Sequence, residues 1–223
     1  MFESYTADGR LQLSANEHCL TLSREVVVTD FHLTFGTCYM ASVMLEPYEI
    51  LVGVRKSTSY IAVKIYQNAS GSRPCTVTSN TGEPVTICIM RRMPAQVDET
   101  NGVGLVLYDE GGTPCYYSGQ NSVAIVGTYE SNDLNSISTG FSGSEYILVD
   151  TVTNGYWNMI SNGGGMYMDL IQWWMSASRY DSSSGTIERA FLNYGRTYED
   201  PPYDMSTKDK PVYKTEYLLL RVI

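Results

Sequence analysis

The two histidines, His18 and His32, are the first residues to consider as catalytic or metal-binding groups. In the segment Asp30-Phe31-His32 an acid and an imidazole share one face of a predicted strand, which suits a general base or a metal ligand. No G-x-S-x-G or H-E-x-x-H motif accompanies them. We therefore expect these side chains to lie on a solvated strand face and predict no metal site.

Paired carboxylates are the second kind of chemistry to consider, because glycoside hydrolysis needs two of them about 5 to 9.5 Å apart in space. With 24 acidic residues in the chain, some pair always meets that condition, so we interpret them as surface charges. The glycine run at 161 to 167, SNGGGMY, lacks the Lys-Ser/Thr of a phosphate loop. We predict a protein that is not an enzyme and holds no cofactor. An enzyme acting on surface polysaccharide stays the weakest alternative, with five candidate acids, Glu145, Asp150, Asp169, Glu188 and Glu199.

Aromatic residues are the clearest candidates for binding. All three tryptophans, Trp157, Trp173 and Trp174, lie in the second half of the chain, and adjacent residues of a strand face opposite sides. One tryptophan of the pair is then free to stack on a sugar ring or to anchor an interface, unless both are buried between layers or at a subunit contact. Tyr198 and Tyr203, which flank two prolines, form a second candidate surface.

The elements that would position these residues are predicted to be strands. The chain has 19 Gly, 18 Tyr and only 17% charged residues, a composition typical of many turns and strands. Apolar residues alternate in TDFHLTF, YIAVKIY and PVTICIM, and tight turns are predicted at Gly9, between MFESYT and RLQLS, and at Gly155, between EYILVDTV and YWNMI. We predict an all-β fold of antiparallel hairpins.

Charge and cysteine content exclude several classes of partner. A formal net charge of −9 disfavours binding to nucleic acid and to anionic membranes, and no segment approaches the ~18 apolar residues that span a bilayer. Five scattered cysteines fit neither a disulfide framework nor a zinc site, so we expect most of them to be small buried residues. These features favour folding in a cytoplasm, without membrane insertion.

The polar segment RRMPAQVDETNG, residues 91–102, is the sharpest change in composition along the chain. We predict a domain boundary there, between a small β module, residues 1–92, and a larger β-sandwich-like module with long loops, residues 93–223.

A short pattern occurs twice, as YTADGRLQLSAN at residues 5–16 and as YDEGGTPCYYSG at residues 108–119. In both, a tyrosine stands four positions before a glycine, Gly9 or Gly112, which we interpret as a turn residue. Aligning the two glycines also brings Leu20 and Leu22 opposite Val123 and Ile125. The letters alone leave duplication and coincidence equally open.

The segments GVGLVLYDEGGTPCYYSGQNSVAIVG, residues 102–127, and MFESYTADGRLQLSANEHCLTL, residues 1–22, resemble parts of small virion proteins of tailed bacteriophages. Those proteins belong to the tail tip or are associated with tail fibres, and the resemblance covers roughly the first 127 residues. It implies a structural protein that binds other phage tail proteins, forms a homo-oligomer, and belongs to the virion tail after assembly in the host cytoplasm. It implies no catalytic residues.

One alternative function comes from the aromatic C-terminal part, residues 128–223, which lies outside that resemblance. This part is suited to binding a host surface receptor or a glycan. A scaffold and a receptor-binding protein are both compatible with the sequence.

Overall fold

The computed structural model describes ten segments of the 223-residue chain, 3–5, 11–14, 20–34, 37–66, 72–92, 105–131, 135–151, 155–160, 169–199 and 215–223. Side chains are described for these segments except at 3–5, 11–14, 155–160, 169–173 and 194–199. Every regular element in this part of the chain is a strand, and all pairings are antiparallel. The predicted all-β fold is confirmed.

The first half of the chain holds nine strands: β1 (Glu3–Tyr5), β2 (Leu11–Ser14), β3 (Leu20–Val28), β4 (His32–Leu33), β5 (Tyr39–Leu45), β6 (Glu49–Lys56), β7 (Ile61–Ile65), β8 (Arg73–Ser79) and β9 (Val85–Arg92). The second half also holds nine: β10 (Val106–Tyr108), β11 (Pro114–Tyr117), β12 (Val123–Ser131), β13 (Ile137–Ser138), β14 (Tyr146–Asp150), β15 (Gly155–Ile160), β16 (Asp169–Asp181), β17 (Thr186–Glu199) and β18 (Thr215–Val222).

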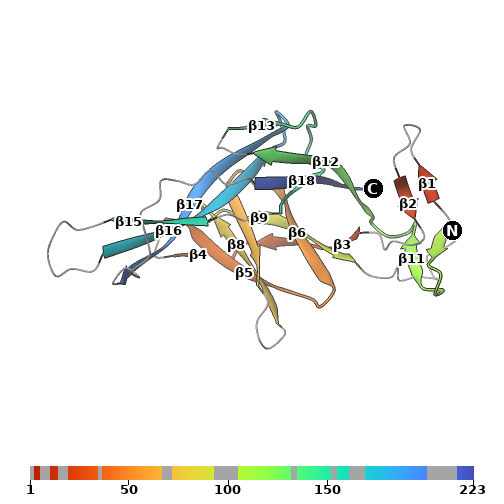
Figure 1. Ribbon diagram of the computed structural model, residues 1–223, viewed down its shortest axis with the longest axis horizontal. Helices are drawn as coiled ribbons and strands as arrows, with labels where there is room; N and C mark the ends of the chain where they lie inside the picture. The colour runs from red at the N-terminus through yellow and green to blue at the C-terminus, as the bar shows by residue number, and fades with distance from the viewer. Residues whose placement is uncertain are drawn as a thin grey trace.

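Two large sheets form the body of the molecule (Figure 1). The six-stranded sheet has the order β12-β18-β14-β6-β9-β3, and the eight-stranded path is β13-β17-β16-β7-β8-β5-β4 with β15 paired to β16. Two small hairpins, β1-β2 and β10-β11, stand apart from both sheets. Figure 1 shows the hairpins at one end of the long axis, and β15 with the start of β16 at the other.

The strand predictions hold in most segments. β7 and β9 direct their alternate apolar residues into the core between the sheets, as predicted for YIAVKIY and PVTICIM. TDFHLTF is different, because only His32–Leu33 is a strand within its described part and Leu33 is 62% exposed. Phe31 packs against the core between the sheets as predicted, but Leu33 does not, because its strand lies at the end of the sheet.

The two hairpins share one pairing register. In the first, Glu3, Ser4 and Tyr5 are opposite Ser14, Leu13 and Leu11, with an irregularity between Ser4 and Tyr5. In the second, Val106, Leu107 and Tyr108 are opposite Tyr117, Tyr116 and Pro114, with the irregularity between Leu107 and Tyr108. Each residue of the first has its counterpart 103 positions later, which is the shift that aligns Gly9 with Gly112.

The same shift of 103 positions continues into the following strands. β3 runs from Leu20 to Val28 and β12 from Val123 to Ser131, so linkers of equal length, 15–19 and 118–122, precede them. β3 has a register shift between Leu22 and Arg24, and β12 has one between Ile125 and Gly127. Shared pairings, irregularities and linker length favour duplication over coincidence.

The body extends this correspondence to six strands of each half. The corresponding strands, in chain order, are β3, β5, β6, β7, β8 and β9 in the first half and β12, β13, β14, β16, β17 and β18 in the second. With this correspondence, the strand order of the six-stranded sheet is the same from either edge. The same matching holds for β13-β17-β16 and β5-β8-β7 in the other sheet. We call residues 3–92 repeat 1 and residues 106–222 repeat 2. They are related as in an approximate two-fold dimer, with β6 beside β14 and β7 beside β16 at the seam.

The predicted division into modules 1–92 and 93–223 does not describe these sheets. Both large sheets contain strands from each side of residue 92, and hydrogen-bonded pairing joins them at the seam. The polar segment at 91–102 is therefore a connection between repeats and not a boundary between independently packed domains. Each repeat would expose a sheet edge, β6 or β14, without the other.

Gly155 is a second correction. The predicted hairpin turn at Asn154-Gly155 requires its flanking strands to pair, but β14 belongs to the six-stranded sheet and β15 pairs with β16 in the other. Gly155 is the first residue of β15, opposite Met175. Gly112 is a turn residue as predicted, with φ of 78° between β10 and β11. Gly9 lies outside the described residues, between two strands that pair as predicted.

Apolar residues are buried on both faces of the six-stranded sheet. One face packs on the other sheet, with Ile87 and Ile89 in repeat 1 and their counterparts Tyr217 and Leu219 in repeat 2. Its other face curls inward until the edge strands β3 and β12 meet at the Thr21–Ser122 bridge. A third apolar cluster inside this curl receives residues from all six strands, among them Met90, Ile147 and Leu220.

Gly53 permits the close approach of β6 and β14 at the seam. A Cβ at this position would lie 2.5 Å from Ile147 Cγ2, 2.8 Å from Val149 Cγ2 and 3.0 Å from the carbonyl oxygen of Leu148. The matching of the repeats places Val149 as the counterpart of Gly53. One small residue therefore makes room for a larger one across the pseudo-two-fold axis.

Gly53→Ala is expected to lower the free energy of unfolding by about 1–3 kcal/mol, because the added methyl overpacks the seam against backbone and branched side chains. Urea unfolding measures this. Gly111→Ala is the matched control, since a Cβ there meets only the Asp109 carboxylate at 3.3 Å on an exposed turn. Equal unfolding midpoints for the two variants would contradict the tight seam.

Candidate functional site

Three polar or aromatic features of the fold are candidates for function: a buried carboxylate at a corner, a cavity at the seam, and an extension of the eight-stranded sheet. The first is Glu49, whose side chain is only 1% exposed. It begins β6, where the chain passes from the eight-stranded sheet to the six-stranded one. Its position and its partners show what it does.

Every donor around Glu49 comes from a segment that meets at this corner. Arg24 binds both carboxylate oxygens, from Nε at 2.9 Å and from Nη2 at 3.0 Å. The Ser23 hydroxyl donates at 2.8 Å, and the Glu46 amide donates at 2.8 Å. Burial raises the pKa of Glu49, but the hydrogen bonds from Arg24, Glu46 and Ser23 together outweigh burial and leave the pKa below its ordinary value. The carboxylate is a structural anchor with all its donors supplied internally.

Glu49→Gln is expected to lower the free energy of unfolding at pH 7 by about 2–3 kcal/mol, because Arg24 loses its bidentate partner. The folded-state pKa of Glu49 lies below the unfolded one, so its stabilisation is complete above the ordinary glutamate pKa of about 4.3 and is lost as the pH falls through the folded value. In urea titrations, the difference between the native protein and Glu49→Gln should shrink as the pH falls below about 4.

Glu46→Gln is the control for this experiment, since Glu46 is exposed three residues before Glu49. It should leave both the stability at pH 7 and its pH dependence close to those of the native protein. A Glu49→Gln deficit that stays constant through the acid range would contradict the proposed ionised, hydrogen-bonded carboxylate.

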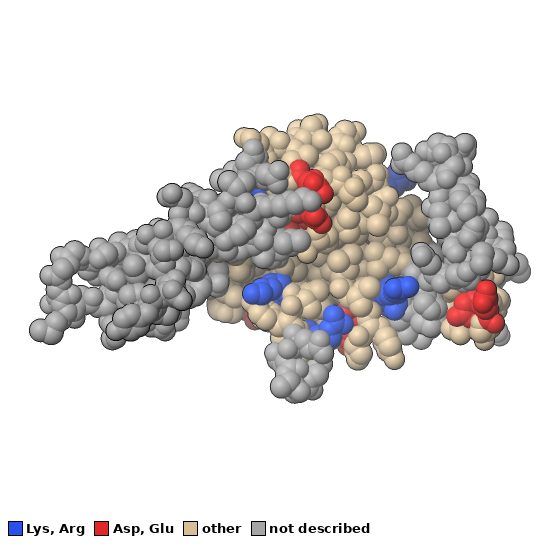
Figure 2. All heavy atoms as spheres, in the orientation of Figure 1, with Lys and Arg blue, Asp and Glu red and all other residues tan. Residues whose placement is uncertain are grey.

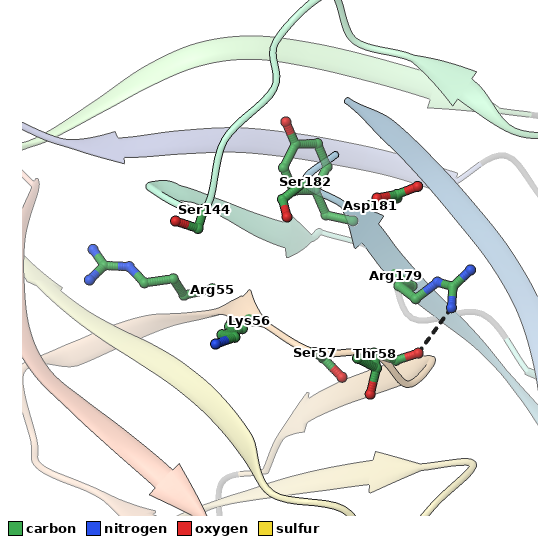
Figure 3. Close-up of a pocket in the computed structure, with 9 residues that line it drawn as sticks. Arg55, Lys56, Ser57, Thr58, Ser144, Arg179, Asp181 and Ser182 are labelled. Atoms are coloured by element: carbon green, nitrogen blue, oxygen red, sulfur yellow. Dashed lines mark hydrogen bonds between the residues drawn. The ribbon is translucent and has the colours of Figure 1, made fainter. Parts of the chain in front are cut away.

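The second feature is a cavity of about 310 Å³ at the seam between the repeats (Figure 3). Repeat 1 contributes the end of β6 and the following turn, residues 55–58, and repeat 2 contributes Ser144 and residues 179–182. Hydroxyl groups form much of its wall. Figure 3 shows Arg55 and Arg179 extending to opposite sides of the cavity.

Three charged side chains at this cavity, those of Arg55, Arg179 and Asp181, are engaged within the fold. Arg55 pairs with Glu25, and Arg179 pairs with Glu188 and donates to the carbonyl oxygen of Thr58 at 3.0 Å. Hydrogen bonds from Ser183 and Ser184 lower the pKa of Asp181 to about 2, so its carboxylate stabilises its own turn. We assign this polar gap no ligand.

Arg179 is also the centre of a polar clasp between the repeats. Tyr60, from repeat 1, donates its hydroxyl to Glu188 Oε2 at 3.0 Å, and the Arg179 guanidinium lies 5.0 Å from the centre of the Tyr60 ring. The hydrogen bond to Glu188 raises the pKa of Arg179, and burial together with Glu188 raises the pKa of Tyr60. The clasp therefore ties β16 and β17 of repeat 2 to the start of β7 in repeat 1.

The third feature is an extension of the eight-stranded sheet, which we call the arm: residues 155–160 of β15, 169–175 of β16 and 192–199 of β17. The pairing register places Trp157 opposite Trp173, and Tyr156 opposite Trp174. Tyr198 is opposite Leu170. The structure thus brings four of the five predicted binding residues to one element, and Tyr203 lies outside the described residues. Trp174, whose side chain is described, is half-buried.

The other predicted chemical groups are dispersed. His32 and Asp30 are exposed, and His18 lies outside the described residues. Among the five candidate acids, Asp169 and Glu199 are opposite one another in β16 and β17, Glu188 belongs to the clasp, and Glu145 is exposed. No cluster of three or more His, Cys, Asp or Glu suited to a metal occurs in the described part of the chain.

Four of the five cysteines are free and buried, as expected, and Cys19 lies outside the described residues. Burial raises the pKa of the Cys75 and Cys88 thiols to about 12. On the face shown in Figure 2, charged side chains of the described residues form separate spots and not one patch. A helix with the length and hydropathy needed to cross a membrane is absent from the described segments.

Sequence reasoning missed Glu49, Arg24, Tyr60 and Arg179. Nothing in the local sequence marks Glu49 as buried, because three of its four hydrogen bonds come from the side chains of Ser23 and Arg24, which the fold brings next to it from an earlier strand. No family model, curated protein or solved structure matches the chain.

Proposed function

We propose that this protein is a structural component of a bacteriophage tail, at the tail tip or associated with a tail fibre, and that it assembles through β-rich interfaces. The resemblance of residues 1–22 and 102–127 to small tail virion proteins suggests this function. The observation that carries it is that these two segments form the same unit, a hairpin followed by a nine-residue strand, with the same register and irregularities.

The arrangement of the two hairpins supports an assembly role. β3 and β12 meet where they begin, since the Leu22 amide donates to the Asn121 carbonyl oxygen at 2.9 Å. Both hairpins therefore leave the body at one end (Figure 1). Within the described residues, each is a two-stranded sheet without a third strand. Such sheets have unpaired edges, which can add to a sheet edge of a neighbouring subunit.

The second hairpin shows what such an element needs from its own residues. Leu107 and Cys115 are buried together, whereas Leu105 and Tyr108 are 51% and 53% exposed. Asp109 holds the turn by accepting hydrogen bonds from the amides of Gly111 and Thr113 at 2.9 and 2.8 Å. An internally fixed turn with exposed apolar residues suits a preformed docking element, because little conformational entropy is lost on contact.

The proposal predicts that the chain co-purifies with tails, and that the N-terminal hairpin is needed for this. Deleting residues 2–16 removes β1 and β2 but spares β3, which begins at Leu20 and pairs with β9. The phage that encodes the protein is grown with either the native or the shortened chain. Its particles are purified on a density gradient and examined by mass spectrometry. The native chain should be present in tails and the shortened chain reduced about tenfold or more, as loss of a docking contact worth ~1.4 kcal/mol would give.

A control variant separates folding from docking. Gly53→Ala weakens the body but leaves both hairpins intact, so at a temperature where it is folded it should be incorporated normally. Absence of the native chain from purified particles would contradict the tail function itself. Full incorporation of the shortened chain would contradict the role of the N-terminal hairpin.

A further inference from the structure

The two outer edges of the second hairpin, β10–β11, are not equally open. β11 begins with Pro114, which has no amide hydrogen, and the register shift leaves Cys115 as an extra residue in the same strand. Prolines and bulges are features that keep an edge strand from pairing with another chain. β10 has neither, and among the described strands only β11 pairs with it. The outer edge of β10 is therefore the one suited to pairing.

The first hairpin is built in the same way. Its register shift leaves Gln12 of β2 as the extra residue, whereas β1 is regular. In both hairpins the second strand carries the irregularity and the first strand does not. The same strand is thus left regular in both repeats, as expected if the first strand is the one that takes a partner.

The backbone of β10 has hydrogen-bonding groups directed away from β11. The Ser118 amide donates to the Leu105 carbonyl oxygen at 3.0 Å, so the backbone groups of Leu105 point toward the β11 side. These groups alternate in direction along an antiparallel strand, so those of Val106 and Tyr108 point outward. The side chains of Leu105 and Tyr108 are exposed. This edge combines free donors and acceptors with apolar side chains.

We propose that β10 pairs with an extended strand of another tail protein, and that this strand carries a lysine or arginine beside Glu110. The inference rests on the proposed tail function and names the partner that the second hairpin takes. An added strand supplies an acceptor to each outward amide and a donor to each outward carbonyl. Its side chains would lie next to Tyr108, where cross-strand apolar pairs add to the stability of the contact.

Charge defines the partner further. Residues 105–119 contain Asp109 and Glu110 and no lysine or arginine. The Asp109 carboxylate accepts two hydrogen bonds from amides of its own turn, whereas Glu110 is exposed. Figure 2 shows an acidic spot at the hairpin end of the molecule. A basic residue on the partner complements this spot. A second copy of the chain is disfavoured, because each copy carries a net charge of −9.

The test is competition for positions in the tail. A host that expresses a tagged native or variant chain is infected with the phage, and mass spectrometry measures the ratio of tagged to untagged chain in purified tails. Val106→Pro removes one outward amide hydrogen and should lower incorporation about tenfold, the usual effect of one lost hydrogen bond at a contact. Val106→Ala is the matched control, since it keeps the amide and should compete nearly as well as the native chain.

The charge is tested in the same assay. Glu110→Lys should lower incorporation about fivefold, because it places like charges together at the contact. Asp30→Lys is the control, since it makes the same change of charge at an exposed residue between β3 and β4 and should have no effect.

Cys115 reports whether the hairpin is intact in each variant, because its thiol is buried there at 2% exposure. Its alkylation by iodoacetamide, measured on the Cys115 peptide, should be as slow in the variants as in the native chain. If Val106→Pro exposes this thiol, Tyr108→Pro removes the other outward amide hydrogen in its place, with Tyr108→Ala as control.

A photoreactive phenylalanine analogue in place of Tyr108 identifies the partner. It should become linked to a segment of another tail protein that contains lysine or arginine, and a link to a second copy of this chain would overturn the proposal. Equal incorporation of a proline variant and its alanine control, or of Glu110→Lys and Asp30→Lys, would also overturn it while the tail function stands. Absence of the native chain from tails is a different result, because it contradicts the tail function itself.

Discussion

The pairing of β6 with β14 at Gly53 is the contact on which the rest of the structure depends. It turns two similar sets of strands into one six-stranded sheet, and β7 beside β16 does the same in the second sheet. Because antiparallel strands at a two-fold seam present the same atoms to each other, any side chain at the axis meets its own counterpart. Two large side chains would collide there, and Gly53 avoids this because it leaves room for the side chain of Val149. Without this close approach, two apolar sheet edges would be exposed in the middle of the molecule.

Polar groups then fix how the strands cross between sheets. Glu49 holds the corner of repeat 1 with four hydrogen bonds from Arg24, Ser23 and Glu46, and the Arg179–Glu188–Tyr60 clasp joins the repeats beside the seam cavity. Apolar packing alone specifies register weakly when both faces of a sheet are buried, whereas a buried charge tolerates few alternative positions for its partners. We infer that these contacts select one register from several that would bury similar area.

Fold class and many strands could be predicted from the sequence because alternation and turn residues are local signals. β7 and β9 follow from alternation, and the shared register of the hairpins follows from Gly9 and Gly112. The two-module division could not be corrected in this way, since a polar linker looks the same between domains and between repeats that share sheets. The predicted turn at Gly155 was wrong for a related reason, because a glycine can begin a strand of another sheet as well as form the turn of a hairpin. For the candidate site, Trp157, Trp173, Trp174 and Tyr198 were predicted from composition. Which residues lie opposite them depends on pairings across three strands, and the buried Glu49 depends on segments 25 residues apart.

The fold places two kinds of surface far apart on one body. Two matching hairpins leave the end where β3 and β12 meet, and the arm extends repeat 2 at the other end (Figure 1). A rigid connection between them requires that the two repeats unfold together. Hydrogen exchange in increasing urea, followed by mass spectrometry of peptides covering β9 and β18, measures this directly. The account predicts one shared urea midpoint for the two strands, and loss of protection in β18 while β9 stays protected would contradict it.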